Sequence, residues 1–387
     1  MRSTFARSAL WLGGVSLVIV ASIVFAVRQQ STAPALPLRH TFDRSTDSWV
    51  AFGEGAQVRI TTKASDVKTG SGALELQYEI RPGSSGSTVL PIDAPALRQM
   101  RALRFWIKAD LDTAIAVVLS EAAGGYYSAW FWVPRNRWQR VELFPTDFTL
   151  NEGPDEPLDP NNRLDPDRIQ AVGIIDLGQF FGLLSQDKRY PLVLNTATGT
   201  HYIHLDDVEV MHQSDRDQRE RRDVVGDPAR GLITWITLGG AELEVMPAPN
   251  PLNAAAFQAT YTQAPGKYVL LTHGLRTADM SQAAALKFSI ASAAPATLVV
   301  YLEERSPGEA FGPRYLLTTT LAGGSVPQQK ALILSEFAHD TTGPADPDGR
   351  LTPNQLKSIS FIDITAAESE RSQQNTLWFS PIEAGPR

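Results

Sequence analysis

Short runs in which apolar and polar residues alternate cover most of the chain after residue 40. Examples are "ALELQYEI" (73–80), "LRFWIKA" (103–109), "AIAVVLSE" (114–121) and "IHLDDVEV" (203–210), and clusters of Gly, Pro, Asp and Asn separate them. Alternation with a period of two is typical of β-strands, and the clusters are typical of turns. Because no run of amphipathic helices interrupts the strands, the pattern predicts an all-β protein built as antiparallel β-sandwiches.

The second half of the chain repeats the pattern of the first. "LRFWIKADLDTAIAVVLSE" from Leu103 aligns without a gap with "LKFSIASAAPATLVVYLEE" from Leu286. "LDPDRIQAVGIID" aligns in the same way with "LTPNQLKSISFID", and the two segments end at Asp176 and Asp363. Self-similarity of this kind predicts two tandem copies of one sandwich unit.

A charged segment separates the two copies. Residues 213–230, "QSDRDQRERRDVVGDPAR", mix acids and bases without apolar periodicity, which is typical of a linker or a solvated spacer. We therefore expect domain 1 over residues 40–212 and domain 2 over residues 231–387.

The N-terminus carries the longest apolar run of the chain. Residues 9–27, "ALWLGGVSLVIVASIVFAV", contain no charged residue and match the thickness of a bilayer core as a helix. They predict one N-terminal transmembrane helix within an anchor or signal segment at 1–30, followed by a tether at 31–39.

The charges around this run indicate its orientation. Arg2 and Arg7 precede it and Arg28 follows it, so the positive-inside rule leaves the bulk of the chain extracytoplasmic on a single-pass membrane protein. The alternative is a signal peptide cleaved near Ala33-Pro34-Ala35.

Composition narrows the list of partners. The 387 residues are 43% hydrophobic and 20% charged, with a formal net charge of −7 and no cysteine. A negative surface repels phosphate backbones, so we expect no nucleic-acid partner. Without cysteine the chain has no disulfide, thiolate metal site or thiol nucleophile.

Five segments together resemble a known group of domains. They are "TFDRSTDSW" (41–49), "LRFWIKA", "RWQRVELFPTDF", "IQAVGIID" and "HYIHLDDVEV". The combination is similar to galactose-binding-like jelly-roll domains of the carbohydrate-binding-module type, related to the domain of complex I intermediate-associated proteins. The resemblance covers about residues 40–212 and extends, more weakly, to a divergent second copy. It implies two stacked antiparallel sheets and, in many members, non-catalytic binding.

The same resemblance implies a structural calcium in domain 1, near the first and last strands. Asp43, Asp206 and Asp207 match the acidic points of the family, whereas the second copy has Ser380 and Pro381 in place of the paired aspartates. Carboxylates and carbonyls are the usual calcium ligands. An equally good interpretation is that these acids cap strand ends and accept hydrogen bonds from backbone amides.

The aromatic stretch "YYSAWFWV" (126–133) divides by strand parity, because successive side chains point to opposite faces. In the family pattern the residue before the proline points inward. Val133, Phe131 and Tyr127 are then core, and Trp130 and Trp132 face outward. Trp138, which opens the next strand, is expected to pack structurally.

The strand at 103–109 adds a third outward tryptophan, because Leu103, Phe105 and Ile107 form a core set. Trp106 then lies between Arg104 and Lys108 on the opposite face, and the second copy has Ser289 at the position of Trp106. The sequence does not say whether the strands of Trp106 and Trp130 share a sheet.

Exposed aromatic rings stack on the C–H faces of sugars, and neighbouring polar groups bind the hydroxyls. Arg104, Tyr126 and Ser128 can supply such hydrogen bonds beside Trp106, Trp130 and Trp132. The competing interpretation is that a loop or the second domain covers these tryptophans.

The sequence thus predicts a membrane-anchored extracytoplasmic protein that binds a polysaccharide or other glycan through an aromatic face of domain 1. The alternative is a structural or assembly protein of the cell envelope or of a membrane complex, which uses the same face to hold an envelope protein. We expect no enzymatic activity, because the chain shows no local pairing of carboxylates, no phosphate-binding glycine motif and no nucleophile elbow.

Overall fold

The computed structural model describes residues 38–386 except 54, 82–85, 93–96, 98, 123, 152–158, 178–197, 213–223, 266–267, 276–279, 307–311 and 367–371. The predicted membrane segment 9–27, most of the tether and most of the charged linker lie outside these residues. Within the described part of the chain, no helix is long and apolar enough to cross a bilayer.

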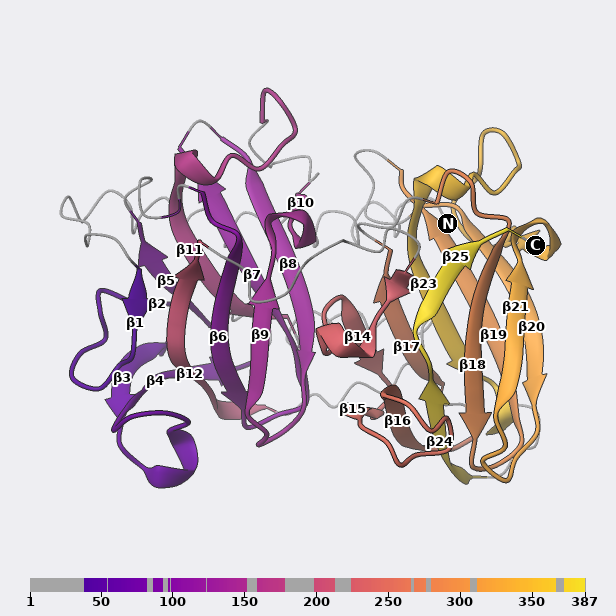
Figure 1. Cartoon of the computed structure of the whole chain (residues 1–387), viewed down its shortest axis with the longest axis horizontal. Coiled ribbons are helices and arrows are strands. Elements are labelled where there is room, and N and C mark those ends of the chain that lie inside the picture. Colours follow the sequence, from indigo (N-terminus) through magenta and orange to yellow (C-terminus); the bar gives the residue numbers. More distant parts are fainter. Residues whose placement is uncertain are drawn as a thin grey trace. The chain divides into compact units, whose positions relative to one another are not determined.

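The chain divides into two compact units, each of which arranges its strands in two layers (Figure 1). Sheet I of unit 1 contains, in spatial order, β3 (Gln57–Thr61), β4 (Ala73–Ile80), β12 (Gly199–Met211), β6 (Ala102–Ala109) and β9 (Gln139–Leu143), and β1 (Arg39–His40) pairs with β12. Sheet II contains β10 (Thr149–Leu150), β8 (Tyr126–Val133), β7 (Thr113–Glu121), β11 (Ile169–Asp176), β5 (Ser87–Pro91) and β2 (Val50–Phe52).

Unit 2 repeats this order. Sheet III contains β13 (Val224–Gly226), β25 (Ile382–Gly385), β18 (Ala285–Ser292), β24 (Gln373–Phe379), β16 (Ala256–Gln263) and β15 (Glu242–Met246), and β21 (Gln328–Ile333) pairs with β18. Sheet IV contains β14 (Trp235–Leu238), β17 (Val269–Gly274), β23 (Leu356–Asp363), β19 (Ala296–Glu304), β20 (Arg314–Leu321) and β22 (Ala338–His339). β13 pairs with β25, so unit 2 begins within the segment predicted as a linker.

Short 3-10 helices connect some of these strands, and several begin with proline, whose fixed φ suits a first helical position. They are η1 (Ala64–Asp66), η3 (Pro145–Asp147), η4 (Pro166–Arg168), η5 (Pro228–Arg230), η6 (Leu334–Glu336) and η7 (Pro353–Gln355). The described elements therefore agree with the predicted all-β fold, and all named strand pairs are antiparallel.

The core of unit 1 lies between sheets I and II. The predicted inward residues Leu103, Phe105 and Ile107 of β6 and Tyr127, Phe131 and Val133 of β8 are all buried, which confirms the parity argument. The rings of Phe105 and Phe131 meet across the two sheets with their centroids 5.9 Å apart. Burial of these alternate positions is the main contribution that holds the layers together.

A polar pair crosses the same core in both units. The Tyr78 hydroxyl of β4 donates to Asp176 Oδ2 of β11 at 2.7 Å, and the Tyr261 hydroxyl of β16 donates to Asp363 Oδ2 of β23 at 2.6 Å. Asp176 and Asp363 are the aspartates that the sequence repeat aligned. The repeat therefore extends from the strand order to individual buried hydrogen bonds.

The last strand of each unit contains one extra residue. In β12 the register against β6 shifts between Asp206 and Glu209, and Asp207 has a positive φ of 48°. In unit 2 the last strand is interrupted at the equivalent place, between β24 and β25, which both pair with β18. Unit 1 accommodates the extra residue as a β-bulge, which bends the strand and breaks its ladder locally.

Candidate functional site

The six predicted ligand-binding residues of unit 1 lie on two different faces. Trp106 and Arg104 belong to β6 of sheet I, whereas Trp130, Trp132, Tyr126 and Ser128 belong to β8 of sheet II. The core lies between these sheets, so their outer faces point in opposite directions. Trp106 and Trp130 therefore cannot form one aromatic platform, and the predicted set has to be divided.

Charged partners occupy the outer face of sheet I around Trp106. The Lys68 ammonium lies over the Trp106 ring, 4.4 Å from its centroid, as a cation–π contact. Arg104 pairs with Glu209 on the neighbouring strand. The flat side of Trp106 that a sugar would need is already taken by a side chain of the same unit.

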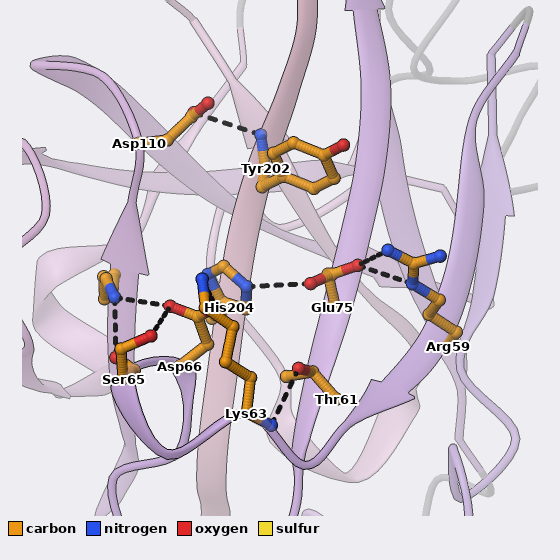
Figure 2. A network of polar contacts seen from close by, with 10 residues as sticks. Arg59, Thr61, Lys63, Ser65, Asp66, Glu75, Asp110, Tyr202 and His204 are labelled. Carbon is orange, nitrogen blue, oxygen red and sulfur yellow. Dashed lines mark hydrogen bonds and ion pairs between the residues drawn. The ribbon is translucent and has the colours of Figure 1, made fainter.

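A network of charged side chains continues along this face (Figure 2), in which Asp66, Glu75 and Lys108 are buried. Asp66 of η1 accepts hydrogen bonds from Lys108 Nζ at 2.7 Å and pairs with Lys63 Nζ at 2.9 Å. Glu75 of β4 accepts from Arg59 Nε at 2.6 Å and lies 3.1 Å from His204 Nε2. Sequence reasoning did not find this network, because its members come from separate strands and a loop.

Three members of the network could hold a metal ion. One ligand atom from each of Asp66, Glu75 and His204 lies within 4.8 Å of the others, and all three residues are buried. However, Lys63, Lys108 and Arg59 already neutralise the two carboxylates. A divalent ion would add positive charge to a place where three cations are in contact, which favours a self-contained ion-pair network.

The pKa shifts of His204 and Asp66 agree with an ion-pair network at this place. Burial lowers the pKa of His204, against the opposing effect of Glu75, so the ring is neutral at neutral pH. Burial acts to raise the pKa of Asp66, but the hydrogen bonds from Lys108 and Lys63 overcome it and hold that pKa well below its usual range.

The three aspartates predicted to hold calcium have other partners. Asp206 accepts hydrogen bonds from the Lys68 and Thr69 amides, both at 2.8 Å, and Asp43 accepts from the Ser71 amide at 2.6 Å. Asp207 pairs with Arg39 at 3.0 Å. N–H donors thus engage all three carboxylates: Asp206 fastens the loop after η1 to β12, Asp43 holds the same loop at Ser71, and Asp207 pairs with β1. This arrangement favours a fastening role over calcium binding.

The outer face of sheet II has a different character. Ladder pairs across β2, β5, β11, β7 and β8 place Phe52, Ser87, Ile175, Ala116 and Trp130 in one line, here called the Phe52–Trp130 row. Phe52 and Trp130 are half-buried and pack against the cluster between them. The row thus has aromatic side chains at both ends and smaller side chains in the middle.

Neutral polar groups border this row. Ser128 Oγ donates to Asn151 Oδ1 at 2.7 Å, and Gln170 Nε2 donates to Ser120 Oγ at 3.2 Å. The outward positions described on sheet II include no charged side chain, as strand parity and the ladder pairs assign them. Hydroxyl and amide groups beside aromatic rings are the chemistry that recognises uncharged, hydroxyl-rich ligands.

Two predicted residues of this face are buried. Trp132 is 6% exposed and Tyr126 is 4% exposed, so both are more deeply buried than the half-buried Trp130. The prediction that Trp130 and Trp132 form an exposed pair is therefore wrong for Trp132. Trp138 is half-buried, and its ring centroid lies 6.5 Å from that of His204, as suits a packing residue.

Sequence reasoning missed Phe52. It lies in β2, a strand of three residues, and so short a strand gives no alternation from which to assign a face. Its only signal in the sequence is the spacing of Val50 and Phe52, two apolar residues separated by one position.

Comparisons with known proteins gave structural matches only. No protein-family model matches the sequence, and no curated protein matches it. Among solved structures, the chain is similar to the family 11 carbohydrate-binding module from Clostridium thermocellum in complex with a β-1,3-1,4-mixed-linked tetrasaccharide. The two are 15% identical with a TM-score of 0.34, over 46% of this chain and 95% of that chain.

Two further matches are of the same kind. The N-terminal CBM22-1-CBM22-2 tandem domain from Paenibacillus barcinonensis Xyn10C is 11% identical, with a TM-score of 0.28 over 93% of this chain and 100% of that chain. TmCBM61 in complex with β-1,4-galactotriose is 14% identical, with a TM-score of 0.27 over 43% of this chain and 88% of that chain. These matches are to carbohydrate-binding modules, the group that the sequence resembles.

Proposed function

We propose that unit 1 is a non-catalytic carbohydrate-binding module whose ligand lies along the outer face of sheet II. The observation that carries this proposal is the Phe52–Trp130 row, in which uncharged side chains separate two half-buried aromatic rings. Trp130 would stack on a sugar ring, and Ser128 and Asn151 would bind hydroxyl groups. A glycosidase needs two carboxyl groups across the bond it cleaves, and the outward positions described on this face supply none.

Charge and burial argue against the other predicted residues as sugar ligands. Lys68 covers Trp106, and Arg104 is engaged by Glu209. Trp132 and Tyr126 are buried and support the face from within. Of the aromatic residues predicted on sheet II, Trp130 is the least buried, and we assign it as the stacking residue.

The alternative, a structural protein that holds an envelope partner by this face, has less support. Protein interfaces usually leave a contiguous apolar patch exposed in the free protein. Among the large hydrophobic residues that the structure describes, Val326 of unit 2 is the exposed one, at 58%.

The proposal is tested by retention of the full chain, in a non-glycosidic detergent, in gels that contain a soluble neutral β-glucan, galactan or xylan. Trp130→Ala is expected to weaken retention roughly tenfold or more, since a central tryptophan at an interface is often worth ~2 kcal/mol. Trp106→Ala is the matched control and should leave retention unchanged. Equal loss in both variants, or no retention on any glycan, would refute a sugar site on sheet II.

We also propose that residues 9–27 hold the protein in a membrane with both units extracytoplasmic. The support is the uncharged run itself and the arginines before it. Deletion of residues 1–30 should move the protein from the membrane fraction to the soluble fraction, and a chain that remains membrane-bound after the deletion would contradict the proposal.

A further inference from the structure

The outer face of sheet III in unit 2 carries a half-buried tryptophan, Trp378, whose two ladder partners are neutral. Trp378 of β24 lies opposite Gln258 of β16 on one side and Ala291 of β18 on the other. The indole Nε1 donates to Gln258 Oε1 at 2.8 Å, and Gln258 Nε2 donates to Glu244 Oε1 at 3.0 Å. The hydrogen bond at one edge fixes the ring on the sheet.

Uncharged polar groups lie near this tryptophan, and Glu244 lies one strand farther away, beyond Gln258. Thr376 lies two residues before Trp378 on the same face, and its hydroxyl is 3.3 Å from that of Thr260 on β16. On the far side of β18, Gln329 Nε2 donates to Ser289 Oγ at 2.7 Å. An aromatic ring is therefore bordered by hydroxyl and amide groups on several strands.

The equivalent positions of unit 1 show that the fold does not require this chemistry. In sheet I the ladder places His204 opposite Glu75 and Lys108, in the same arrangement as Trp378 opposite Gln258 and Ala291. Unit 2 thus has an indole, an amide and a methyl group where unit 1 has an imidazole, a carboxylate and an ammonium group. The exchange removes all three titratable groups and replaces the imidazole of His204 with the larger, flat and half-buried indole of Trp378.

We infer that the outer face of sheet III is a second glycan-contacting site, and that its ligand is a neutral polysaccharide chain. Trp378 stacks on a pyranose ring, while Thr376, Thr260 and the amide of Gln258 border it with groups that bind sugar hydroxyls. An anionic polymer is disfavoured because Trp378, Gln258 and Ala291 supply no positive charge and Glu244 beside Gln258 would repel it. The site is separate from the Phe52–Trp130 row, so each unit offers a contact of its own to a polysaccharide.

The experiment compares the full chain with Trp130→Ala, Trp378→Ala and the double variant, in gels that contain a soluble neutral β-glucan, galactan or xylan. The Trp130→Ala chain is expected to keep measurable retention, and the double variant to lose roughly tenfold or more of what is left. If Trp130→Ala alone removes all retention, the site on sheet III is refuted. If Trp378→Ala alone removes all retention, the site on sheet III stands and the proposed site on sheet II fails.

A second pair of variants tests the chemistry of the site without removing the tryptophan. Ala291→Lys introduces the ammonium group that unit 1 carries at this position and should weaken the residual retention of the Trp130→Ala chain by a similar factor. Because Ala291 is buried, hydrogen exchange of the unit 2 amides has to show that this variant stays folded. Thr262→Lys adds the same charge at an exposed position of β16 and should leave retention unchanged. Unchanged retention in both lysine variants would overturn the proposal.

The oligomeric state decides between a glycan and a second copy of the chain. Sedimentation velocity without polysaccharide should give the same mass for wild type and Trp378→Ala. A wild-type dimer that Trp378→Ala dissociates would make sheet III a protein interface and refute the glycan site.

Discussion

The two units share their interior and differ on their surfaces. The Tyr78–Asp176 pair of unit 1 recurs as Tyr261–Asp363 in unit 2, on equivalent strands and with nearly the same hydrogen-bond length. On the outer faces, by contrast, His204 of sheet I becomes Trp378 of sheet III. The interior pair is kept in both units whereas the outer positions differ, so we expect the outer differences to indicate where function resides.

The outer faces of sheets II and IV differ as well. In sheet II the half-buried Trp130 lies next to the small Ala116, whereas in sheet IV Thr318 lies next to Val299 at the equivalent ladder position. Tyr301, at the position of Val118, is covered by Arg314 at 5.8 Å from its ring centroid. Unit 1 therefore has half-buried tryptophans on both of its sheets, with Lys68 over Trp106 on sheet I, whereas Trp378 of unit 2 lies on sheet III.

The largest expected effect concerns the shared interior. Asp176→Ala should destabilise unit 1 by about 4 kcal/mol, because the hydroxyls of Tyr78 and Thr113 both lose their buried acceptor. Asp363→Ala should destabilise unit 2 similarly. Urea unfolding of the full chain, followed by hydrogen exchange in each unit, measures both values.

The exposed Asp167 provides the control for these variants, since Asp167→Ala should change stability by less than about 0.5 kcal/mol. A large effect in one unit and a small effect in the other would break the equivalence of the two interiors.

The next effect depends on pH and belongs to unit 2. His273 lies at the ladder position of Leu90 in unit 1, opposite Ile359, and its ring stacks 4.7 Å from that of Trp235. Burial lowers the pKa of His273 to about 4, with a smaller opposing effect from the carbonyl of Val225. Below pH 6.5 the unfolded chain binds a proton that the folded unit refuses, so stability is complete above pH 6.5 and is lost as pH falls toward 4.

The loss of unit 2 stability between pH 6.5 and 4 should reach about 3 kcal/mol, since one unit of pKa corresponds to about 1.4 kcal/mol. Hydrogen exchange of unit 2 amides across this range measures it. His273→Leu, which introduces the residue of unit 1, should flatten the dependence, and an unchanged slope in that variant would assign the pH sensitivity to another group.

The smallest effect concerns the charged outer face. Lys108→Ala introduces the residue that unit 2 has at this position and should destabilise unit 1 by about 2 kcal/mol. This value is below the 3–5 kcal/mol typical of a broken buried pair, because Asp66 keeps Lys63. Lys68→Ala removes an exposed side chain of the loop after η1 and should lower the stability of unit 1 by at most about 1 kcal/mol. Thermal unfolding of the two variants ranks them, and equal losses would mean that burial does not strengthen the Asp66–Lys108 pair.

Strand parity made the inward residues predictable from sequence, and the gap-free alignment of the two halves made the repeat predictable. Phe105 and Phe131 face the core because alternation is a local property that each strand carries in its own residues. The grouping of Trp106 with Trp130 was not predictable, because the order of strands in a sheet depends on pairing between distant segments. β6 pairs with β12 and β9, whereas β8 pairs with β7 and β10.

The surroundings of the candidate residues were even less accessible from sequence. Lys68 over Trp106 and the amides that bind Asp206 come from one loop that folds across the sheet, and no spacing in the sequence places it there. The burial of Trp132 likewise depends on tertiary packing. Local patterns therefore predicted which way a side chain points, but not what lies against it.

Because both units have the extra residue at the same point of the last strand, this strand could be exchanged between the two units. In unit 1 the inward side chains change from Ile203 and Leu205 to Val208 and Val210, from odd to even positions across the bulge. In unit 2 they change in the same way, from Phe379 to Ile382. Because both units change phase at the same point, a last strand transplanted from one unit to the other would keep its apolar residues in the core, whereas a graft joined one residue out of step would turn them to solvent.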